Sequence, residues 1–295
     1  MVEFNERWLG LALRHEHRKV WQESTKPPLL EILIDNYLGH KGGPWIRLLD
    51  HLRDKTQMTF HSLGMDLGGT AALDLNYLQE IKRLIQRYGP IMVSDHLAYC
   101  RGEKIMTYDL LPIPLTPASL QRVKERVHQV QEILGQRICL ENISSYFQWQ
   151  QDSIPEMEFL NDLCQSTGCG ILLDINNLIV STSNLKQLLP EVLSSLRPQH
   201  IWQYHMAAHT SRYGLKHDTH EGPLTDSHLR LAKTIFKSIG KRPMILEREN
   251  ASIEELMESR NQLIDQWRQS HETPGISLPR YPTTRSSSPS HPTPE

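Results

Sequence analysis

The sequence lacks the features that mark several common classes of protein. Its four cysteines, Cys100, Cys139, Cys164 and Cys169, show no C-x-x-C spacing, which argues against a zinc ribbon and a thioredoxin-type motif. No apolar run approaches the ~20 residues that a membrane-spanning helix needs. The N-terminus carries acidic residues and has no apolar stretch typical of a secretory signal. We therefore expect a cytoplasmic protein with no membrane segment.

The chain also has no surplus of charge of either sign. Its formal net charge of −2 provides no electrostatic attraction to nucleic acid or to an anionic membrane. Neither a G-x-G-x-x-G string nor a P-loop occurs, and the pairs Gly42-Gly43 and Gly68-Gly69 fit turns better than phosphate-binding loops. We expect neither nucleic acid nor membrane as a partner.

The C-terminal segment differs in composition from the rest of the chain. Residues 271–295 are rich in proline, serine and threonine and have almost no apolar content. Such a segment buries too little surface to order itself, so we expect a disordered tail. Residues 1–270 suit one large domain, because α/β barrels of about 250 residues fold as single units.

Short apolar runs recur along the chain, and each ends at a residue that can bind a metal or transfer a proton. The runs are LGLAL before His17, LLEILI before Asp35-Asn36, MTF before His61, IMVSD before His96, ICL before Glu141-Asn142, ILL before Asp174, IWQY before His205 and MIL before Glu247. This pattern is typical of barrel strands that deliver side chains to a shared mouth.

Segments with helical periodicity separate these runs. They are Pro44–Lys55, Asp74–Tyr88, Thr116–Leu134, Glu156–Cys164, Leu185–Leu196, Asp226–Ile239 and Ile253–Trp267. Alternation of strands and helices favours βαβ units and a parallel sheet. Eight runs favour closure, so the sequence predicts an α/β fold, a (β/α)₈ TIM barrel with a polynuclear metal site at its C-terminal face.

The predicted site combines imidazole and oxygen ligands, which suit zinc, iron, manganese or cobalt. Several carboxylates buried at one mouth would cost several kcal/mol per unpaired charge without cations. The candidate metal ligands are His61, His96, Glu141, Asp174, Asn176, His205, Asp218, His220 and Glu247.

Three details refine this prediction. Glu141 is a candidate to bridge two cations. Asp218 and His220 point the same way if the backbone there is extended, and both can then reach one ion. By the same strand parity Asn176 shares the face of Asp174, so we prefer it to Asn177 as a ligand.

Other polar residues receive weaker assignments. Arg14 and His17 lie at the end of the first strand, where they suit a layer behind the ligands or an anchor for the substrate. The roles of Asp95 and His209 stay open. Six histidines fall on polar helix faces, in loops or in the tail, and we expect them to be solvated: His40, His51, His128, His228, His271 and His291.

The strings themselves resemble a known family. LALRHEH, LLEILIDNYLGHKGGPW, FHSLGMDLGG, VSDHLAYC, YDLLPIPLT, ICLENISSY, TGCGILLDINNLIVSTSN, YHMAAH, DTHEGPL and ILERE follow one another in the order and spacing of the multinuclear non-haem iron-dependent oxidases. This is the family of the oxidase that helps make methanobactin. The resemblance covers about Leu11 to Glu249.

The resemblance implies a TIM barrel that holds two or three iron ions, Fe²⁺ and Fe³⁺, with O₂ as co-substrate. It implies a cysteine-containing, ribosomally made precursor peptide as substrate and a separate partner protein that presents the peptide's leader segment. The motifs also assign roles near the site to Arg14, His17, Asp35 and Asn36, which we group as catalytic candidates.

The chain departs from the family pattern at a few positions. Asp35 stands where a Glu-Asn pair is common, which shortens the side chain by one methylene. Ala208 replaces a customary glycine in the H-x-A-G-H string, and Arg248-Glu249 follow Glu247 where Trp and Asp are typical. None of these changes removes a candidate ligand.

Two other functions remain open on the sequence. One is a divalent-metal TIM-barrel hydrolase or isomerase, such as an endonuclease IV-like or xylose isomerase-like enzyme, because these folds also gather His, Asp and Glu at strand ends. The other is a metal-binding or scaffold protein without catalysis, which the full ligand set argues against.

Overall fold

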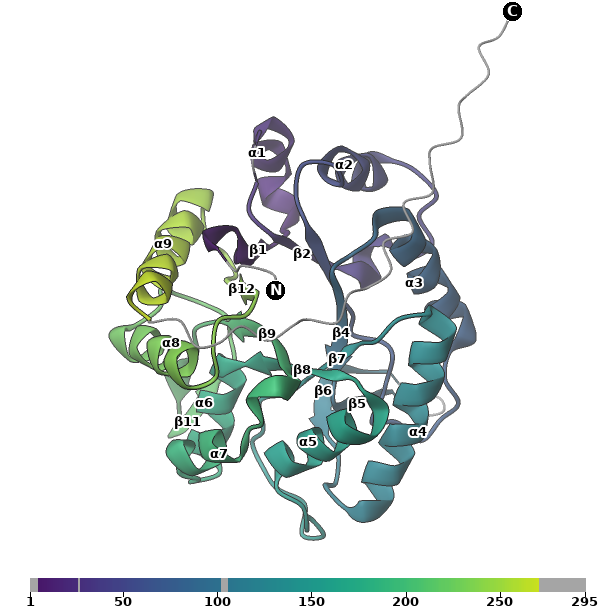
Figure 1. Cartoon of the computed structure of the whole chain (residues 1–295), viewed down its shortest axis with the longest axis vertical. Helices are drawn as coiled ribbons and strands as arrows, with labels where there is room; N and C mark the ends of the chain where they lie inside the picture. Colours follow the sequence, from purple (N-terminus) through teal and green to yellow (C-terminus); the bar gives the residue numbers. More distant parts are fainter. Residues whose placement is uncertain (1–4, 26, 102–105, 271–295) are drawn as a thin grey trace, which may run out of the picture.

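The computed structural model describes residues 5–25, 27–101 and 106–270, and it confirms the predicted barrel. Eight parallel strands close on themselves at the centre of the molecule, and helices surround them (Figure 1). The barrel strands are β1 (Leu9–Ala12), β2 (Leu30–Leu33), β3 (Met58–His61), β4 (Met92–His96), β7 (Cys139–Glu141), β8 (Gly170–Asp174), β9 (Ile201–Met206) and β12 (Met244–Leu246).

The register of the strands aligns two pairs of candidate ligands on neighbouring strands. Neighbours follow the order β1-β2-β3-β4-β7-β8-β9-β12 and back to β1. His96 is level with Glu141 on the next strand. Asp174 is level with His205 in the same way. Because all eight strands run parallel, their carboxyl ends open into one mouth.

Helices cover the outside of the barrel. All seven predicted helical segments contain one, with ends shifted by a few residues. The helices are α1 (Arg18–Glu23), α2 (Pro44–Leu52), α3 (Leu75–Tyr88), α4 (Pro117–Leu134), α5 (Glu156–Thr167), α6 (Ile175–Asn184), α7 (Leu189–Ser195), α8 (Asp226–Ser238) and α9 (Ile253–Gln269). The sequence did not indicate α1 or α6 as helices. Short 3₁₀ turns hold His17 (His15–His17) and Asp35 (Ile34–Tyr37).

Two hairpins stand outside the barrel sheet, and the periodicity did not predict them. β5 (Ala98–Arg101) pairs antiparallel with β6 (Met106–Pro112) after β4. β10 (Thr210–Arg212) pairs antiparallel with β11 (Leu215–His217) after β9. Both hairpins follow carboxyl ends of barrel strands, so they lie on the side of the mouth.

Leucine and isoleucine side chains dominate the buried core. Among the described residues, none of the helices is long and apolar enough to cross a membrane. The tail predicted for residues 271–295 lies outside the described residues.

Candidate metal centre

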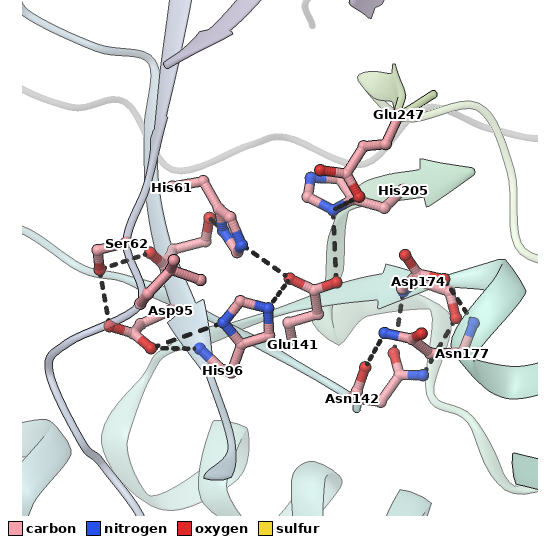
Figure 2. Close-up of polar contacts among 12 residues, drawn as sticks. His61, Ser62, Asp95, His96, Glu141, Asn142, Asp174, Asn177, His205 and Glu247 are labelled. Carbon is pink, nitrogen blue, oxygen red and sulfur yellow. Dashed lines mark hydrogen bonds and ion pairs between the residues drawn. The ribbon is translucent and has the colours of Figure 1, made fainter. Parts of the chain in front are cut away.

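Four barrel strands place four candidate ligands in contact at the mouth. His61 ends β3, His96 ends β4, Glu141 ends β7 and His205 lies near the end of β9. Their side chains are at most 8% exposed. Figure 2 shows Glu141 between His61 and His96 on one side and His205 on the other. We call these four residues the inner cluster.

The two oxygens of Glu141 face different imidazoles. Oε2 lies 3.3 Å from Nε2 of His61 and 3.3 Å from Nε2 of His96. Oε1 lies 3.4 Å from Nδ1 of His205. A carboxylate with one imidazole set at each oxygen has the geometry of a bridge between two cations. The candidate bridging role of Glu141 therefore has a structural basis.

Asp174 and Glu247 extend the site on the side of His205. Glu247 Oε2 lies 3.4 Å from Nδ1 of His205 (Figure 2). Ligand atoms of Glu141, Asp174 and His205 lie within 4.8 Å of one another, as do those of His61, His96 and Glu141. The buried His and Glu clusters share members and can bind metal ions.

A second set, Asn176, Asp218 and His220, lies further out and forms the outer group. His220 Nε2 is 3.0 Å from Asp218 Oδ1, and Asn176 Nδ2 donates to the same oxygen over 2.6 Å. His220 Nδ1 is 3.8 Å from Glu247 Oε2, which connects the outer group to the rest of the site.

The reasons given for two of these residues were wrong. Asn176 belongs to α6 and not to a strand, so strand parity does not orient its side chain. Asp174 caps that helix by accepting a hydrogen bond from the backbone amide of Asn177. His220 has a φ of +54°, so the chain from Asp218 to His220 is not extended throughout. Both residues nevertheless reach the site.

Charges at the site are balanced by protons when no cation is bound. Burial and the neighbouring His96 lower the pKa of His61 to about 4. Burial opposes protonation of His96, but the carboxylates of Glu141 and Asp95 outweigh it and raise the pKa to about 9. Burial, with repulsion from Glu141 and Asp218, raises the pKa of Asp174 well above its usual value. A cation would displace such protons.

The donor set fits a cation. Within the described residues, three buried side-chain atoms that face the site have no hydrogen-bond partner: Glu141 Oε2, Asp174 Oδ2 and His205 Nδ1. Buried polar atoms without partners are costly, and the lone pairs on three imidazoles and several carboxylates can all be satisfied by metal ions. No cysteine sulfur belongs to these clusters.

Neighbouring polar groups orient the inner cluster. Ser94 Oγ donates to the carbonyl of Phe60 and lies 2.8 Å from Nδ1 of His61, which leaves Nε2 of that ring for Glu141. Asp95 accepts hydrogen bonds from Ser62 Oγ and from the backbone amide of His96 (Figure 2). Asp95, whose role the sequence left open, therefore anchors the segment that follows β3.

The catalytic candidates lie beside the clusters and not in them. Arg14 forms an ion pair with Glu249, and His17 Nε2 lies 2.9 Å from the carbonyl oxygen of Ala251. Asp35 accepts hydrogen bonds from Tyr77 Oη and from the amide of Leu63, two residues beyond His61.

Asn36, the remaining catalytic candidate, is exposed in the turn after β2. The contacts described for Arg14, His17 and Asp35 join them to residues other than the candidate ligands. The roles assigned to all four residues therefore stay predictions. Arg14 and His17 join the segment after β1 to the segment after β12, and Asp35 joins the turn after β2 to the segment after β3. These segments follow the carboxyl ends of barrel strands, beside the mouth.

A histidine pair supports the outer group from behind. His209, whose role the sequence left open, lies with Nδ1 2.8 Å from Oδ1 of Asn176. Its Nε2 faces the ammonium of Lys216. His228 Nε2 lies 3.2 Å from the same Nδ1 of His209. The expectation that His228 is solvated was wrong, because it is 2% exposed beneath His209.

The sequence reasoning also missed a polar layer below the inner cluster. Glu31, Thr59 and Gln203 are 3%, 0% and 0% exposed. Thr59 and Gln203 precede His61 and His205 by two residues, so both pairs face the barrel interior. The sequence did contain a signal for Thr59 and Gln203: each is a polar residue inside an apolar run, two positions before a candidate ligand.

Two curated proteins are similar to this chain over most of its length. The chain is 34% identical over 249 residues to UPF0276 protein RB0508 of Rhizobium meliloti (strain 1021), covering 82% of this chain and 80% of that protein. A UPF0276 protein of Chromobacterium violaceum is 35% identical over 239 residues, covering 81% and 86%.

Solved structures share the fold at low identity. Endonuclease IV from Thermus thermophilus matches with a TM-score of 0.57 at 14% identity, covering 89% of this chain and 98% of that one. D-Psicose 3-epimerase from Clostridium cellulolyticum H10 matches with a TM-score of 0.56 at 10% identity, covering 90% and 97%. Identities this low show the fold alone.

A family model settles the relationship. The model described as "RiPP precursor modification enzyme MbnB/TglH/ChrH" matches residues 8–266, nearly all of the barrel, so the chain belongs to this family of enzymes that modify ribosomally made peptide precursors.

Proposed function

We propose that this protein is an O₂-dependent multinuclear iron oxidase that modifies cysteine residues of a precursor peptide. The observation that carries the proposal is Glu141, whose two oxygens each face different imidazoles of the inner cluster. This arrangement supports two adjacent cations, and imidazole with carboxylate is a donor set that iron accepts.

The proposed assignment of ligands to ions follows the contacts between the side chains. His61, His96 and one oxygen of Glu141 would hold one ion, while His205, the other oxygen, Asp174 and Glu247 would hold a second. Asn176, Asp218 and His220 would supply a third position. Bound iron supplies the redox chemistry with O₂, and the buried walls of the site keep water away from it.

The rim of the mouth supports a peptide substrate. Large apolar side chains are exposed there on the loop after β7 and on both hairpins, namely Leu111, Tyr146, Phe147, Trp149, Tyr213 and Leu215. The indole nitrogen of Trp149 donates to the carbonyl of Pro112, which ties the loop to the β5–β6 hairpin. Exposed apolar groups gathered at one place are typical of a binding surface for another chain.

The first experiment measures metal content and Mössbauer spectra of protein purified anaerobically from iron-replete cells. The proposal predicts two or three iron ions per chain and a mixed-valent signal after partial reduction. Stoichiometric zinc or manganese with little iron would instead favour a hydrolase or isomerase. Protein without bound metal would overturn the proposal.

The second experiment tests the reaction. Iron-loaded protein, with a partner protein that presents the leader segment, should change the mass of a cysteine-containing precursor peptide only when O₂ is present. A serine replacement of the peptide's cysteine is the matched control. Intact cysteine peptide under these conditions, with confirmed iron loading, would contradict the proposed substrate.

A further inference from the structure

The polar layer below the inner cluster converges on one carboxylate. Glu31, from β2, is buried in the barrel interior. Its Oε2 accepts hydrogen bonds from Thr59 Oγ1 over 2.9 Å and from Gln203 Nε2 over 2.7 Å. Its Oε1 lies 2.8 Å from Nε2 of His205. Both oxygens therefore have partners, which come from β3 and β9.

This geometry determines which nitrogen of His205 carries a proton. An unprotonated Nε2 would place its lone pair against a carboxylate oxygen 2.8 Å away, which is repulsive, whereas Nε2–H donates a charge-assisted hydrogen bond. The amide nitrogen of Gln203 lies 3.3 Å from the same Nε2 and offers only hydrogen atoms. Between these two neighbours, Glu31 is the acceptor for Nε2 of His205.

The other nitrogen of His205 faces the metal site. Nδ1 lies 3.4 Å from Glu141 and 3.4 Å from Glu247 and has no hydrogen-bond partner within the described residues. In a ring that holds one proton at Nε2, the lone pair on Nδ1 is free for a cation.

We infer that Glu31 is a positioning residue that holds His205 in the Nε2–H tautomer, so that this histidine binds its cation through Nδ1. His61 has the opposite arrangement, because its Nδ1 faces Ser94 and its Nε2 faces Glu141. The centre would thus combine one Nδ1-bound imidazole with Nε2-bound ones. A carboxylate behind a histidine also increases the basicity of the ligating nitrogen.

A competing reading makes Glu31 itself a ligand, because Glu31, His205 and Glu247 have atoms within 4.8 Å of one another. The contacts oppose it. Glu31 touches the ring at Nε2, whereas Glu141 and Glu247 touch it at Nδ1. The inference requires that the site holds a cation, but it does not depend on the reaction that follows, so it can fail or succeed separately from the proposed oxidase function.

The test uses Zn²⁺ as a diamagnetic probe of the full chain. Chelator competition measures the affinity, and ¹⁵N NMR of labelled histidine reports which ring nitrogen is metal-bound. In the wild-type protein we expect His205 bound through Nδ1 with a proton at Nε2. Glu31→Gln preserves shape but offers one acceptor oxygen for three donors, so Zn²⁺ should bind more weakly by roughly 10–100-fold, as for other groups behind a metal ligand.

A second variant moves the carboxylate across the same nitrogen. Gln203 lies within 3.3 Å of Nε2, so Glu31→Gln combined with Gln203→Glu restores a carboxylate acceptor at unchanged net charge. We expect this double variant to recover most of the lost affinity and the His205 pattern in the spectrum. Thr59→Val is the matched control, since it removes a donor to Glu31 without touching His205.

Three results would overturn the inference. Zn²⁺ bound at Nε2 of His205 would contradict the tautomer directly. Unchanged affinity and spectrum in Glu31→Gln would show that the carboxylate does not position the ring. Loss of one ion in Glu31→Gln without recovery in the double variant would identify Glu31 as a ligand. Circular dichroism of the metal-free variants separates these results from a failure to fold.

Discussion

The inner cluster and the outer group use similar residues on different supports. His61, His96, Glu141 and His205 come from four barrel strands, and their side chains are at most 8% exposed. Asp218 and His220 follow the β10–β11 hairpin in a loop, and their side chains are 16% and 22% exposed. Ligands on strands are fixed by the register of the sheet, whereas ligands on a loop depend on side-chain contacts.

This difference suggests two kinds of metal position in one mouth. The inner positions are preorganised, because the strand register puts His96 level with Glu141 and Asp174 level with His205. The outer position depends on the contact between Asp218 and Asn176 and on the histidine pair behind it. We therefore expect the inner ions to be bound tightly and the outer ion to exchange more readily.

Removing the bridge should have the largest effect. Glu141→Gln leaves one oxygen where two face different imidazoles, so one inner position loses its ligand and the other keeps only a neutral amide oxygen. We expect metal affinity to weaken by more than roughly 100-fold, beyond the range for groups behind a ligand, and peptide modification to fall below detection. Elemental analysis after purification checks the metal. Glu158→Gln, exposed on α5, is the control, and equal metal in both variants would refute the bridge.

Substitution in the outer group should have a smaller effect. Asp218→Asn removes the carboxylate that accepts from Asn176 and lies beside His220, but touches none of the strand ligands. We expect loss of about one ion per chain, with the inner ions retained, because amides are weaker ligands than carboxylates for such cations. Metal counts that match the wild type, or the loss of every ion, would remove the distinction between the two positions.

The same contrast explains what the sequence could predict. The eight strands, and the placement of the candidate ligands at their ends, could be predicted, because apolar runs ending at His, Asp or Glu have one simple placement in a parallel barrel. Asn176 was chosen for a wrong reason, since the chain turns into α6 directly after Asp174. The sequence pattern around Asp174 would look the same whether the strand continued or ended there with the aspartate as the cap of a helix.

Contacts between distant segments were not accessible in the same way. Glu31 and Gln203 meet across 172 positions of sequence, and each looked like an isolated polar residue in an apolar run. His228 looked solvated on a polar helix face, but it is buried in the folded chain, where its ring lies against His209, the residue before β10. Burial of this kind comes from tertiary packing and leaves no mark on helical spacing.

Proton release on metal loading should next distinguish individual histidines of the site. The pKa of His220 is raised to about 10: burial opposes this, but Glu247 and Asp218 outweigh it, so the metal-free ring is protonated at pH 7. A cation must expel that proton, and loading should therefore strengthen as pH rises. In the inner cluster burial opposes protonation of His96, but Glu141 and Asp95 outweigh it and raise the pKa to about 9, so His96 must also lose a proton. His61, with a pKa lowered to about 4 by burial and by His96, has no such proton to lose.

Calorimetry in buffers of different ionisation enthalpy counts these protons. His220→Asn should release fewer protons than the wild type during Zn²⁺ loading at pH 7, by roughly one. His40→Asn, exposed and distant in the turn before α2, is the control. An unchanged proton count would mean that His220 is neutral before the cation arrives.

The smallest predicted effect concerns the support behind the outer group. Burial, together with the nearby His209 and the ammonium of Lys216, lowers the pKa of His228 from 6.5 to about 4. Below pH 6.5 the unfolded chain takes up a proton that the folded chain does not bind until about pH 4, so this residue makes unfolding easier as pH falls through that window.

His228→Gln should therefore flatten the pH dependence of stability and not simply reduce stability. Urea unfolding of metal-free protein at several pH values between 7 and 5 measures the slope, and His128→Gln, exposed on α4, is the control. A slope that matches the wild type would show that His228 does not contribute to the loss of stability in acid. A flatter slope would show that the neutral form of His228 supports the outer group, and that its protonation contributes to unfolding in acid.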